Sequence, residues 1–388
     1  MKVLVNSIIL TVSIVSAGIA YASDSAEQAI GGRITVGRVK IEIGEDLYIW
    51  NQGEPIPEKT ASGFTSPATV MSFVNVQPGD VMTVSALDRE VFRASKRLVG
   101  SRFFYEADVA VIPPSSDLSR RTVYVRVTEG FLDRFGGGNA YGMYGRDNIG
   151  GERKSFRAYA GYNRAGGEYT DDRLSGTDFI AGAKFYYTSS DRAVRDLIRS
   201  RSFDATVFAG YRFTPGLKLV CDARYRFIMI NHISKSVKDD EKDRERRGYN
   251  RNMIDYASFL PAFYGTFSYG LEMSEENISS AGIDGIDARR YHGILKSSVG
   301  TDAISLNVKF SSGVIGGKPA FYDLFDLYTT EDESVRSGYS ARELFARDFA
   351  MMNAELRFGI YEAKIPPIIT IRFAGFLFAD MAYLSGTR

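Results

Sequence analysis

Cysteine and histidine are scarce in this sequence of 388 residues, and each scarcity excludes a class of protein. The single cysteine, Cys221, has no partner for a disulfide within the chain, so a disulfide-stabilised fold is excluded. The only two histidines, His232 and His292, lie far apart in the sequence, which argues against a metal site. We therefore expect neither a disulfide framework nor a bound metal.

An excess of charge of one sign and long apolar runs are also missing. The 48 basic and 47 acidic side chains leave a formal net charge of +1, so nothing points to nucleic acid as a partner. Beyond residue 22, no segment approaches the ~20 apolar residues that a transmembrane helix needs.

Catalytic motifs are absent as well. No Ser/His/Asp set or Cys/His pair stands in a plausible context. The glycines at 136–138 lack the Gly-Lys-Ser/Thr that follows in a phosphate-binding loop, and a turn at the entry to a barrel explains them better. We expect no enzyme activity and no small-molecule cofactor.

The N-terminus has the features of a signal peptide. Lys2 precedes an apolar run from Val3 to Ile19, and Ala20-Tyr21-Ala22 offers the small residues that signal peptidase reads. A retained membrane anchor is the alternative, but the run is short and polar residues follow at 23–25. We predict cleavage after Ala22, with residues 1–22 removed on export.

Residues 33–130 predict an α+β module of order β-α-α-β-β. Its clearest helix is expected to have Ser85 as N-cap, with Asp88 in the first turn and Gly100 just past the end. The other expected elements are a strand at 39–43, a weakly indicated helix at 68–76, and strands at 107–112 and 122–129.

From residue 136 to 388 the sequence alternates apolar and polar residues in segments of about ten. Residues 203–213 and 217–227 are the clearest cases, with arginines on the polar face. This pattern is typical of an antiparallel transmembrane β-barrel, although a soluble β-sandwich also alternates. The export signal and the polar-face arginines favour a barrel of about eleven strands between Asn139 and Leu384.

The connections of this expected barrel differ in length and charge. The tight turn at 214–216 is expected to face the periplasm. Lys238 to Arg247 are ten consecutive charged residues, which indicate a solvated loop outside the cell.

Two parts of the chain resemble one known family. Residues 79–130, with Arg97-Leu98, Phe103-Phe104 and the strand from Val123 to Gly130, resemble a POTRA domain of BamA-type outer-membrane assembly and secretion proteins. The barrel of that family carries a Val-Arg-Gly-Tyr/Phe loop motif, which Val335-Arg336-Ser337-Gly338-Tyr339 resembles. Residues 353–358 and 376–382 resemble the two strands that follow that loop.

The resemblance implies a lock inside the barrel. In the family, the loop arginine folds inward and pairs with acidic residues on the two strands, so Arg336 would meet Glu355 and Asp380, with Gly338 and Tyr339 completing the loop motif. Strand periodicity independently places both carboxylates on the polar face. A bidentate arginine–carboxylate contact there would hold a long loop in one place.

The sequence departs from the family at three points. Ser337 stands within the loop motif, and Ala382 replaces the usual glycine. The family continues for about three strands beyond its aspartate-bearing strand, whereas this sequence stops at Arg388. A short member and an incomplete C-terminus both remain open.

The resemblance implies a protein that helps client polypeptides to insert into, or cross, the outer membrane. Its expected partners are outer-membrane lipid and an unfolded client, which would bind a strand edge of the POTRA-like module in the periplasm. A passive porin-like channel and a structural surface antigen are the alternatives. A loop fixed inside the barrel favours the first function, and an open conducting pore favours the second.

Overall fold

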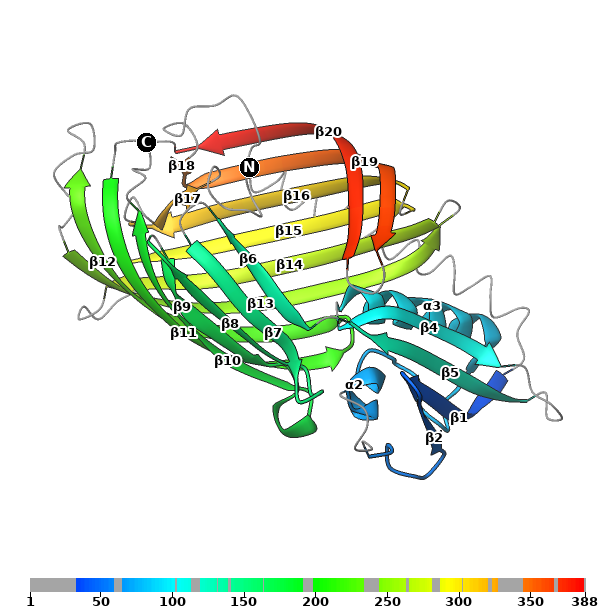
Figure 1. Cartoon of the computed structure of the whole chain (residues 1–388). Helices are drawn as coiled ribbons and strands as arrows, with labels where there is room; N and C mark the ends of the chain where they lie inside the picture. Colours follow the sequence, from blue (N-terminus) through cyan, green and yellow to red (C-terminus); the bar gives the residue numbers. More distant parts are fainter. Residues whose placement is uncertain are drawn as a thin grey trace.

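The computed structural model contains two main sheets, one in each part of the chain, and one small two-stranded sheet (Figure 1). A five-stranded sheet lies within residues 33–129 and a thirteen-stranded sheet within residues 133–385. The predicted signal peptide, residues 1–22, lies outside the described residues. The structure describes residues 33–58, 65–101, 103–112, 119–130, 132–138, 141–162, 164–190, 198–233, 244–262, 265–280, 287–301, 303–319, 323–326, 345–365 and 369–386.

The N-terminal module has two more strands than the sequence indicated. Its sheet has the order β2-β1-β5-β4, in which β1 and β5 are parallel and β3 pairs with the start of β1. The strands β2 and β3 were not predicted, and the first helix is only five residues long. The elements are β1 (Arg33–Ile43), β2 (Asp46–Asn51), α2 (Pro67–Met71), β3 (Val81–Thr83), α3 (Val84–Gly100), β4 (Phe104–Ile112) and β5 (Arg120–Glu129).

The helix α3 begins two residues earlier than predicted. Its N-cap is Thr83, whose hydroxyl oxygen accepts a hydrogen bond from the backbone N–H of Ala86 at 3.2 Å, so the prediction of Ser85 was wrong. At the other end, Gly100 is the last helical residue and Ser101 is the cap. The apolar stripe of this helix is fully buried against the sheet. It consists of Leu87, Ala94 and Leu98.

Leu98→Ala in the module, residues 33–130, is expected to lower the free energy of unfolding by ~2–5 kcal/mol, because it leaves a cavity under α3. Chemical denaturation of the module measures this loss. Val99→Ala is the matched control, since Val99 is the next residue and is exposed. An equal effect of both substitutions, or a disordered module, would contradict the predicted packing.

The large sheet is wholly antiparallel, as predicted, and its strands pair in the order in which they occur in the chain. It has twelve strands after Asn139, where about eleven were expected, and a further strand before it. The strands are β6 (Asp133–Gly138), β7 (Tyr141–Ile149), β8 (Lys154–Gly161), β9 (Arg164–Asp171), β10 (Phe179–Ser190), β11 (Ile198–Thr214), β12 (Leu217–Ile233), β13 (Arg244–Ala262), β14 (Gly265–Ser280), β15 (Ala288–Gly300), β16 (Ile304–Gly317), β19 (Asp348–Ile365) and β20 (Ile369–Ser385).

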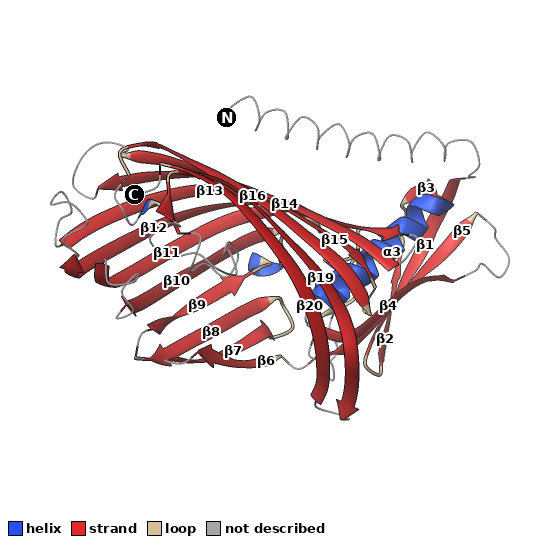
Figure 2. Cartoon of the chain, turned by 90° about the horizontal axis from the view of Figure 1, so that it is seen from above, coloured by secondary structure: helices blue, strands red, loops and turns tan. Residues whose placement is uncertain are grey.

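The sheet curls strongly, so one face becomes an interior and the other an exterior (Figures 1 and 2). Its borders are β6 and β20, and no hydrogen-bonded pairing joins these two strands within the described part of the chain. The strand register confirms the predicted alternation. In β11 and β12, for example, Asp204 lies opposite Arg226 on one face, and Phe203 lies opposite Phe227 on the other.

The two ends of the curled sheet differ. One end carries the short turns, including residues 215–216, and contacts the module, since Arg93 of α3 donates to the backbone oxygen of Phe259 at 3.2 Å. The other end carries the longest connections, at 191–197, 234–243 and 318–347, besides the short ones at 139–140 and 162–163. We call them the module end and the loop end.

The charged run near the loop end is not entirely a loop. Residues 238–243 lie outside the described residues, but Arg244 to Arg247 already belong to β13, and Arg247 is buried. The expectation of one solvated loop was wrong for these four residues, since they belong to a strand. Arg247 is directed inward, where it pairs with the carboxylates of Asp287 and Asp323. No described helix is long and apolar enough to cross a membrane.

Candidate functional site in the interior of the large sheet

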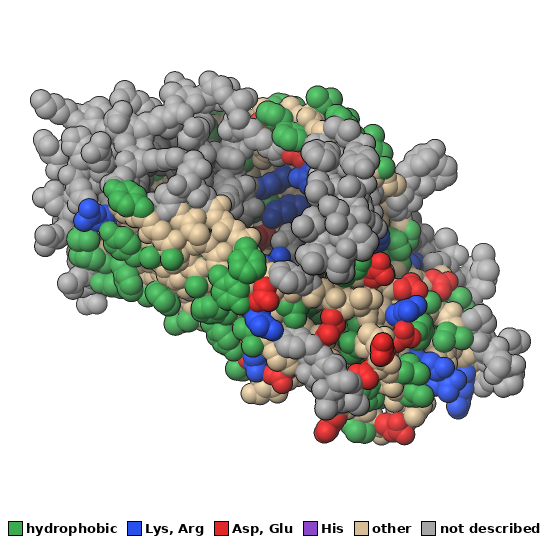
Figure 3. Space-filling view, viewed as in Figure 1, with side chains coloured by type: hydrophobic (Ala, Val, Ile, Leu, Met, Phe, Trp, Pro, Cys, Tyr) green, Lys and Arg blue, Asp and Glu red, His purple; other side chains and the backbone are tan. Residues whose placement is uncertain are grey.

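The interior face of the large sheet is lined by charged side chains. Because neighbouring strands are paired directly, residues that lie opposite each other share a face, and the charged positions of successive strands form continuous rows. In Figure 3, basic side chains are visible inside the hollow of the sheet, while hydrophobic side chains cover its outer surface.

Ion pairs between neighbouring strands neutralise most of these charges. Across β8 to β10, the Glu168 carboxylate accepts hydrogen bonds from the Arg157 guanidinium and from the Tyr186 hydroxyl, each at 2.7 Å. Across β11 to β13, Arg226 contacts Asp204 at 2.5 Å and Arg251 contacts Asp222 at 2.6 Å. In these pairs, the charges of neighbouring strands neutralise each other.

At the loop end, the interior holds a segment from the long connection between β16 and β19. Asp323 is fully buried there, and its carboxylate accepts a hydrogen bond from the Tyr249 hydroxyl at 2.9 Å. The guanidinium of Arg247 lies 3.6 Å from the same carboxylate and 2.7 Å from that of Asp287. Arg290 donates to the backbone oxygen of Asp323. Two strands, β13 and β15, thus hold this one residue.

Phe325, two residues after Asp323, is also packed inside the sheet. The ring of Phe325 packs edge-on against Phe349, with centroids 4.7 Å apart, and Arg290 lies 5.0 Å above it. A side chain larger than hydrogen at Gly313 of β16 would overlap the Phe325 ring, so this glycine makes room for it. The short strands β17 (Phe325–Asp326) and β18 (Phe345–Ala346) pair beside this contact. We call Asp323 and Phe325 the interior anchor.

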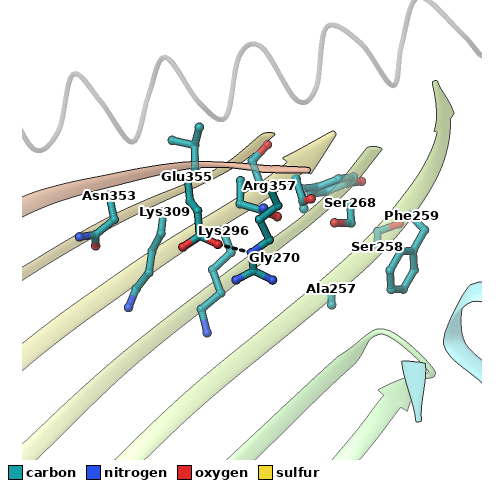
Figure 4. A pocket seen from close by; sticks show the side chains of 15 residues that line it. Ala257, Ser258, Phe259, Ser268, Gly270, Lys296, Lys309, Asn353, Glu355 and Arg357 are labelled. Atoms are coloured by element: carbon teal, nitrogen blue, oxygen red, sulfur yellow. Dashed lines mark hydrogen bonds and ion pairs between the residues drawn. The ribbon is translucent and has the colours of Figure 1, made fainter. Parts of the chain in front are cut away.

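At the module end, the interior is open. A cavity of about 430 Å³ is lined there by β13, β14, β15, β16 and β19. Its charged lining consists of Lys296, Lys309, Arg357 and Glu355 (Figure 4). Arg357 and Glu355 are paired with each other, and Figure 4 shows Lys296 and Lys309 side by side, directed into the open space.

The predicted lock residues are placed only in part. Arg336, Gly338 and Tyr339 lie outside the described residues. Glu355 and Asp380 face the interior on the adjacent strands β19 and β20. Asp380 lies opposite Asn353, which is two residues from Glu355 on the same face of β19. Glu355 is buried and bound by Arg357, and Asp380 accepts a hydrogen bond from the Asn353 amide at 2.8 Å.

Sequence reasoning missed the interior anchor. Tyr249 and Arg247 share the inward face of β13, so their alternation was a usable signal. No local pattern marked Asp323, however, because its partners lie on strands far away in the sequence.

A second cluster of contacts joins the module to the large sheet. The turn between β7 and β8 reaches under α2, where the Thr69 hydroxyl donates to the backbone oxygen of Gly151 at 2.6 Å. The Asn148 amide donates to the Thr65 hydroxyl at 2.8 Å. Asn148 and Arg153 both have a left-handed backbone conformation, with φ of 51° and 62°. Residues other than glycine rarely adopt this conformation. We call this turn and α2 the junction.

Arg153 is the centre of the junction. Its buried guanidinium donates to the Ser72 hydroxyl at 2.8 Å and to the Asp172 carboxylate at 2.7 Å, and it stacks 4.2 Å over the Phe73 ring. Burial lowers the pKa of Arg153 to about 10, so it stays charged at neutral pH. Asp172 also binds Arg212 of β11 at 2.7 Å.

The charge of Asp172 is maintained by its two basic partners. Burial opposes ionisation of this carboxyl, but the guanidiniums of Arg153 and Arg212 outweigh it and hold the pKa of Asp172 below its usual range. The junction therefore stays ionised at neutral pH. Among the described residues, no group of three or more His, Cys, Asp or Glu side chains is placed to hold a metal ion.

Comparison with known proteins finds similarity in structure only. The chain is similar to BamA from Haemophilus ducreyi lacking POTRA domains 1–3, at 13% identity and a TM-score of 0.46, over 90% of this chain and 72% of that one. It is also similar to CdiB from Acinetobacter baumannii, at 11% identity and a TM-score of 0.49, and to CdiB from Escherichia coli, at 10% and 0.48.

The match to CdiB from Acinetobacter baumannii covers 90% of this chain and 64% of that one. The match to CdiB from Escherichia coli covers 89% of this chain and 65% of that one. No protein-family model matches the chain, and no curated protein matches it in sequence.

Proposed function

We propose that the chain is an outer-membrane protein whose large sheet spans the bilayer and assists client polypeptides to insert into, or cross, the membrane. The exterior face supports the membrane part of this proposal, because it exposes a broad apolar surface that water disfavours and lipid covers. Its exposed residues include Phe185, Phe203, Val207, Phe213, Ile254, Met273, Val299, Ile304, Leu377 and Met381.

The observation that carries the transport part is the interior anchor. A passive channel needs an open path along its axis, whereas Asp323 and Phe325 are held inside the sheet by ion pairs and ring contacts. A fixed segment inside the sheet favours a protein that handles polypeptides over a porin-like channel. It also favours this function over a purely structural surface antigen, for which a segment held inside the sheet has no evident use.

We place the module in the periplasm, at the end with short turns, and assign it the client-binding role. Strand β2 forms one border of its sheet and has no second neighbour among the described strands. Leu47 and Ile49 of this strand are exposed on the same face, on either side of the buried Tyr48. Their side chains can contact a strand that is added at this border. An unfolded client is thus expected to bind along β2.

The lock between Arg336 and the two carboxylates is part of the same proposal. Glu355 and Asp380 support it, since both face the interior on neighbouring strands. The lock would tie the loop to β19 and β20, while the interior anchor ties its first part to β13.

Fractionation tests the location. The mature protein is expected in the outer membrane, with slower migration on gels after heating because folded barrels resist cold detergent. A soluble periplasmic product would contradict the proposal.

Photo-crosslinking tests the client role with a defined probe, an unfolded outer-membrane barrel polypeptide diluted from urea. Crosslinkers at Leu47 and Ile49 are expected to capture it, and one at Val99 on α3, which is equally exposed, is the control. Equal capture at all three positions, or capture at none, would count against binding along β2.

A further inference from the structure

The cavity at the module end contains two lysines that face each other across neighbouring strands. Lys296 of β15 is paired directly with Lys309 of β16 in the strand register. Like charges directly opposite each other in a sheet are destabilising, since their side chains emerge only ~4.5–5.5 Å apart. Figure 4 shows both side chains extending in the same direction into the cavity.

Lys296 differs from three other cations of the interior, Lys184, Lys218 and Arg357, each of which has an acidic partner. Lys184 lies 4.0 Å from Glu168, Lys218 lies 3.0 Å from Asp255, and Arg357 is bound to Glu355. Lys296, in contrast, has no hydrogen bond or ion pair with any residue in the described ranges. Lys296 is exposed to the open interior, so its ammonium group is accessible to a ligand from solution.

The lining of the cavity fits a small oxyanion. Its charged side chains are three cations, Lys296, Lys309 and Arg357, and one carboxylate, Glu355, so the lining has an excess of positive charge. Ser298 and Asn307, which lie opposite each other one pair of inward-facing residues away, add hydroxyl and amide donors. Lysine ammonium groups act as point charges for phosphate, and neutral donors satisfy the remaining oxygens.

We propose that this cavity binds a soluble phosphate-type dianion between Lys296 and Lys309. The bound anion offsets the repulsion between the two ammonium groups, and the cavity of about 430 Å³ has room for it. The anion enters from solution rather than from lipid, because both lysines are on the interior face and the exterior face carries the apolar side chains. The site does not depend on client handling, and it adds a ligand to the proposed protein.

Isothermal titration of inorganic phosphate into the full mature protein, folded in an uncharged detergent at constant ionic strength, tests the proposal. Wild type is expected to bind, and Lys296→Gln and Lys309→Gln are each expected to weaken binding at least tenfold. Lys184→Gln is the matched control: it removes the same charge from the interior, yet Glu168 keeps Arg157 as a partner. Its affinity is expected to stay within twofold of wild type.

Three results would overturn the assignment. They are no binding of phosphate to wild type, unchanged binding by Lys296→Gln, and an equal loss in Lys184→Gln, which would indicate only a diffuse field. Binding of a short-chain phosphatidic acid but not of inorganic phosphate would overturn the soluble source.

Folding is controlled by a second measurement. Phosphate is expected to raise the melting temperature of wild type and of Lys184→Gln, but not of Lys296→Gln, because a ligand stabilises only the state that binds it. Lys296→Gln removes a like-charge contact and is expected to fold, which heat-modified migration on gels verifies. Failure of the outer-membrane fractionation would leave this binding result intact, so the two proposals fail separately.

Discussion

Arg153→Ala is expected to release the N-terminal module from the large sheet. The substitution leaves the Asp172 carboxylate with one guanidinium instead of two and removes the contacts to Ser72 and Phe73. Breaking a buried pair by removing one partner typically costs ~3–5 kcal/mol. Limited proteolysis of the folded protein should therefore cut between residues 129 and 133 at least tenfold faster than in wild type.

The matched control for this prediction is the next residue. Lys154→Ala also removes a cation, but Lys154 pairs at 2.5 Å with Glu152, which is exposed, and such pairs contribute little. Its cleavage is expected to match wild type. If Arg153→Ala were cut no faster than Lys154→Ala, the junction would not be what holds the module.

Asp323→Asn is expected to free the segment held inside the sheet. The amide keeps the shape of the side chain but loses the charge that Arg247 neutralises, and Tyr249 keeps only a weaker acceptor. The effect is expected near ~3 kcal/mol, the lower end for a broken buried pair, because Arg247 retains Asp287. Proteolysis within residues 318–347 and ion conductance in planar bilayers should both rise severalfold.

Four further variants separate the interior anchor from the proposed lock. Asp255→Asn, which disturbs the pair with Lys218 at the module end, should leave cleavage within 318–347 unchanged. Arg336→Ala tests the proposed lock in the same assay, beside a Glu355→Gln/Asp380→Asn double variant. Arg336→Lys is expected to be impaired too, since lysine lacks the planar fork that pairs with a carboxylate. Identical cleavage in wild type, Arg336→Ala and the double variant would mean that Arg336 is only a surface residue of the loop.

The strands that could be predicted are those whose two faces meet different surroundings. Residues 203–213 and 217–227 alternate between apolar and polar side chains, and the structure pairs them as the hairpin of β11 and β12. Strand β2 was missed because both of its faces are apolar. Tyr48 packs into the module core and Leu47 is exposed on the other side, so no alternation is visible.

Two kinds of position could not be predicted from the sequence. One is a helix cap for which two neighbouring residues are both suitable, and the other is a residue whose contacts come from elements distant in the chain. Thr83 and Ser85 both carry a capping hydroxyl, and only the pairing of β3 with β1 settles that Thr83 caps α3. The Gly150-Gly151 pair marks a turn, but not the left-handed backbone of Arg153 nor its contact with α2. Asp323 is fixed by residues more than thirty positions away.

The strand order of the large sheet has a consequence for how such a protein changes its size. Because each strand of the sheet, apart from the borders β6 and β20, pairs with the strands of this sheet that come before and after it in the chain, neighbours in space are also neighbours in strand order. A hairpin can therefore be duplicated or lost as a unit, and its former neighbours can pair with each other without rerouting the chain. Gene segments that encode single hairpins would widen or narrow the sheet by two strands at a time. Hairpins that carry the junction or the interior anchor would be the ones least free to vary.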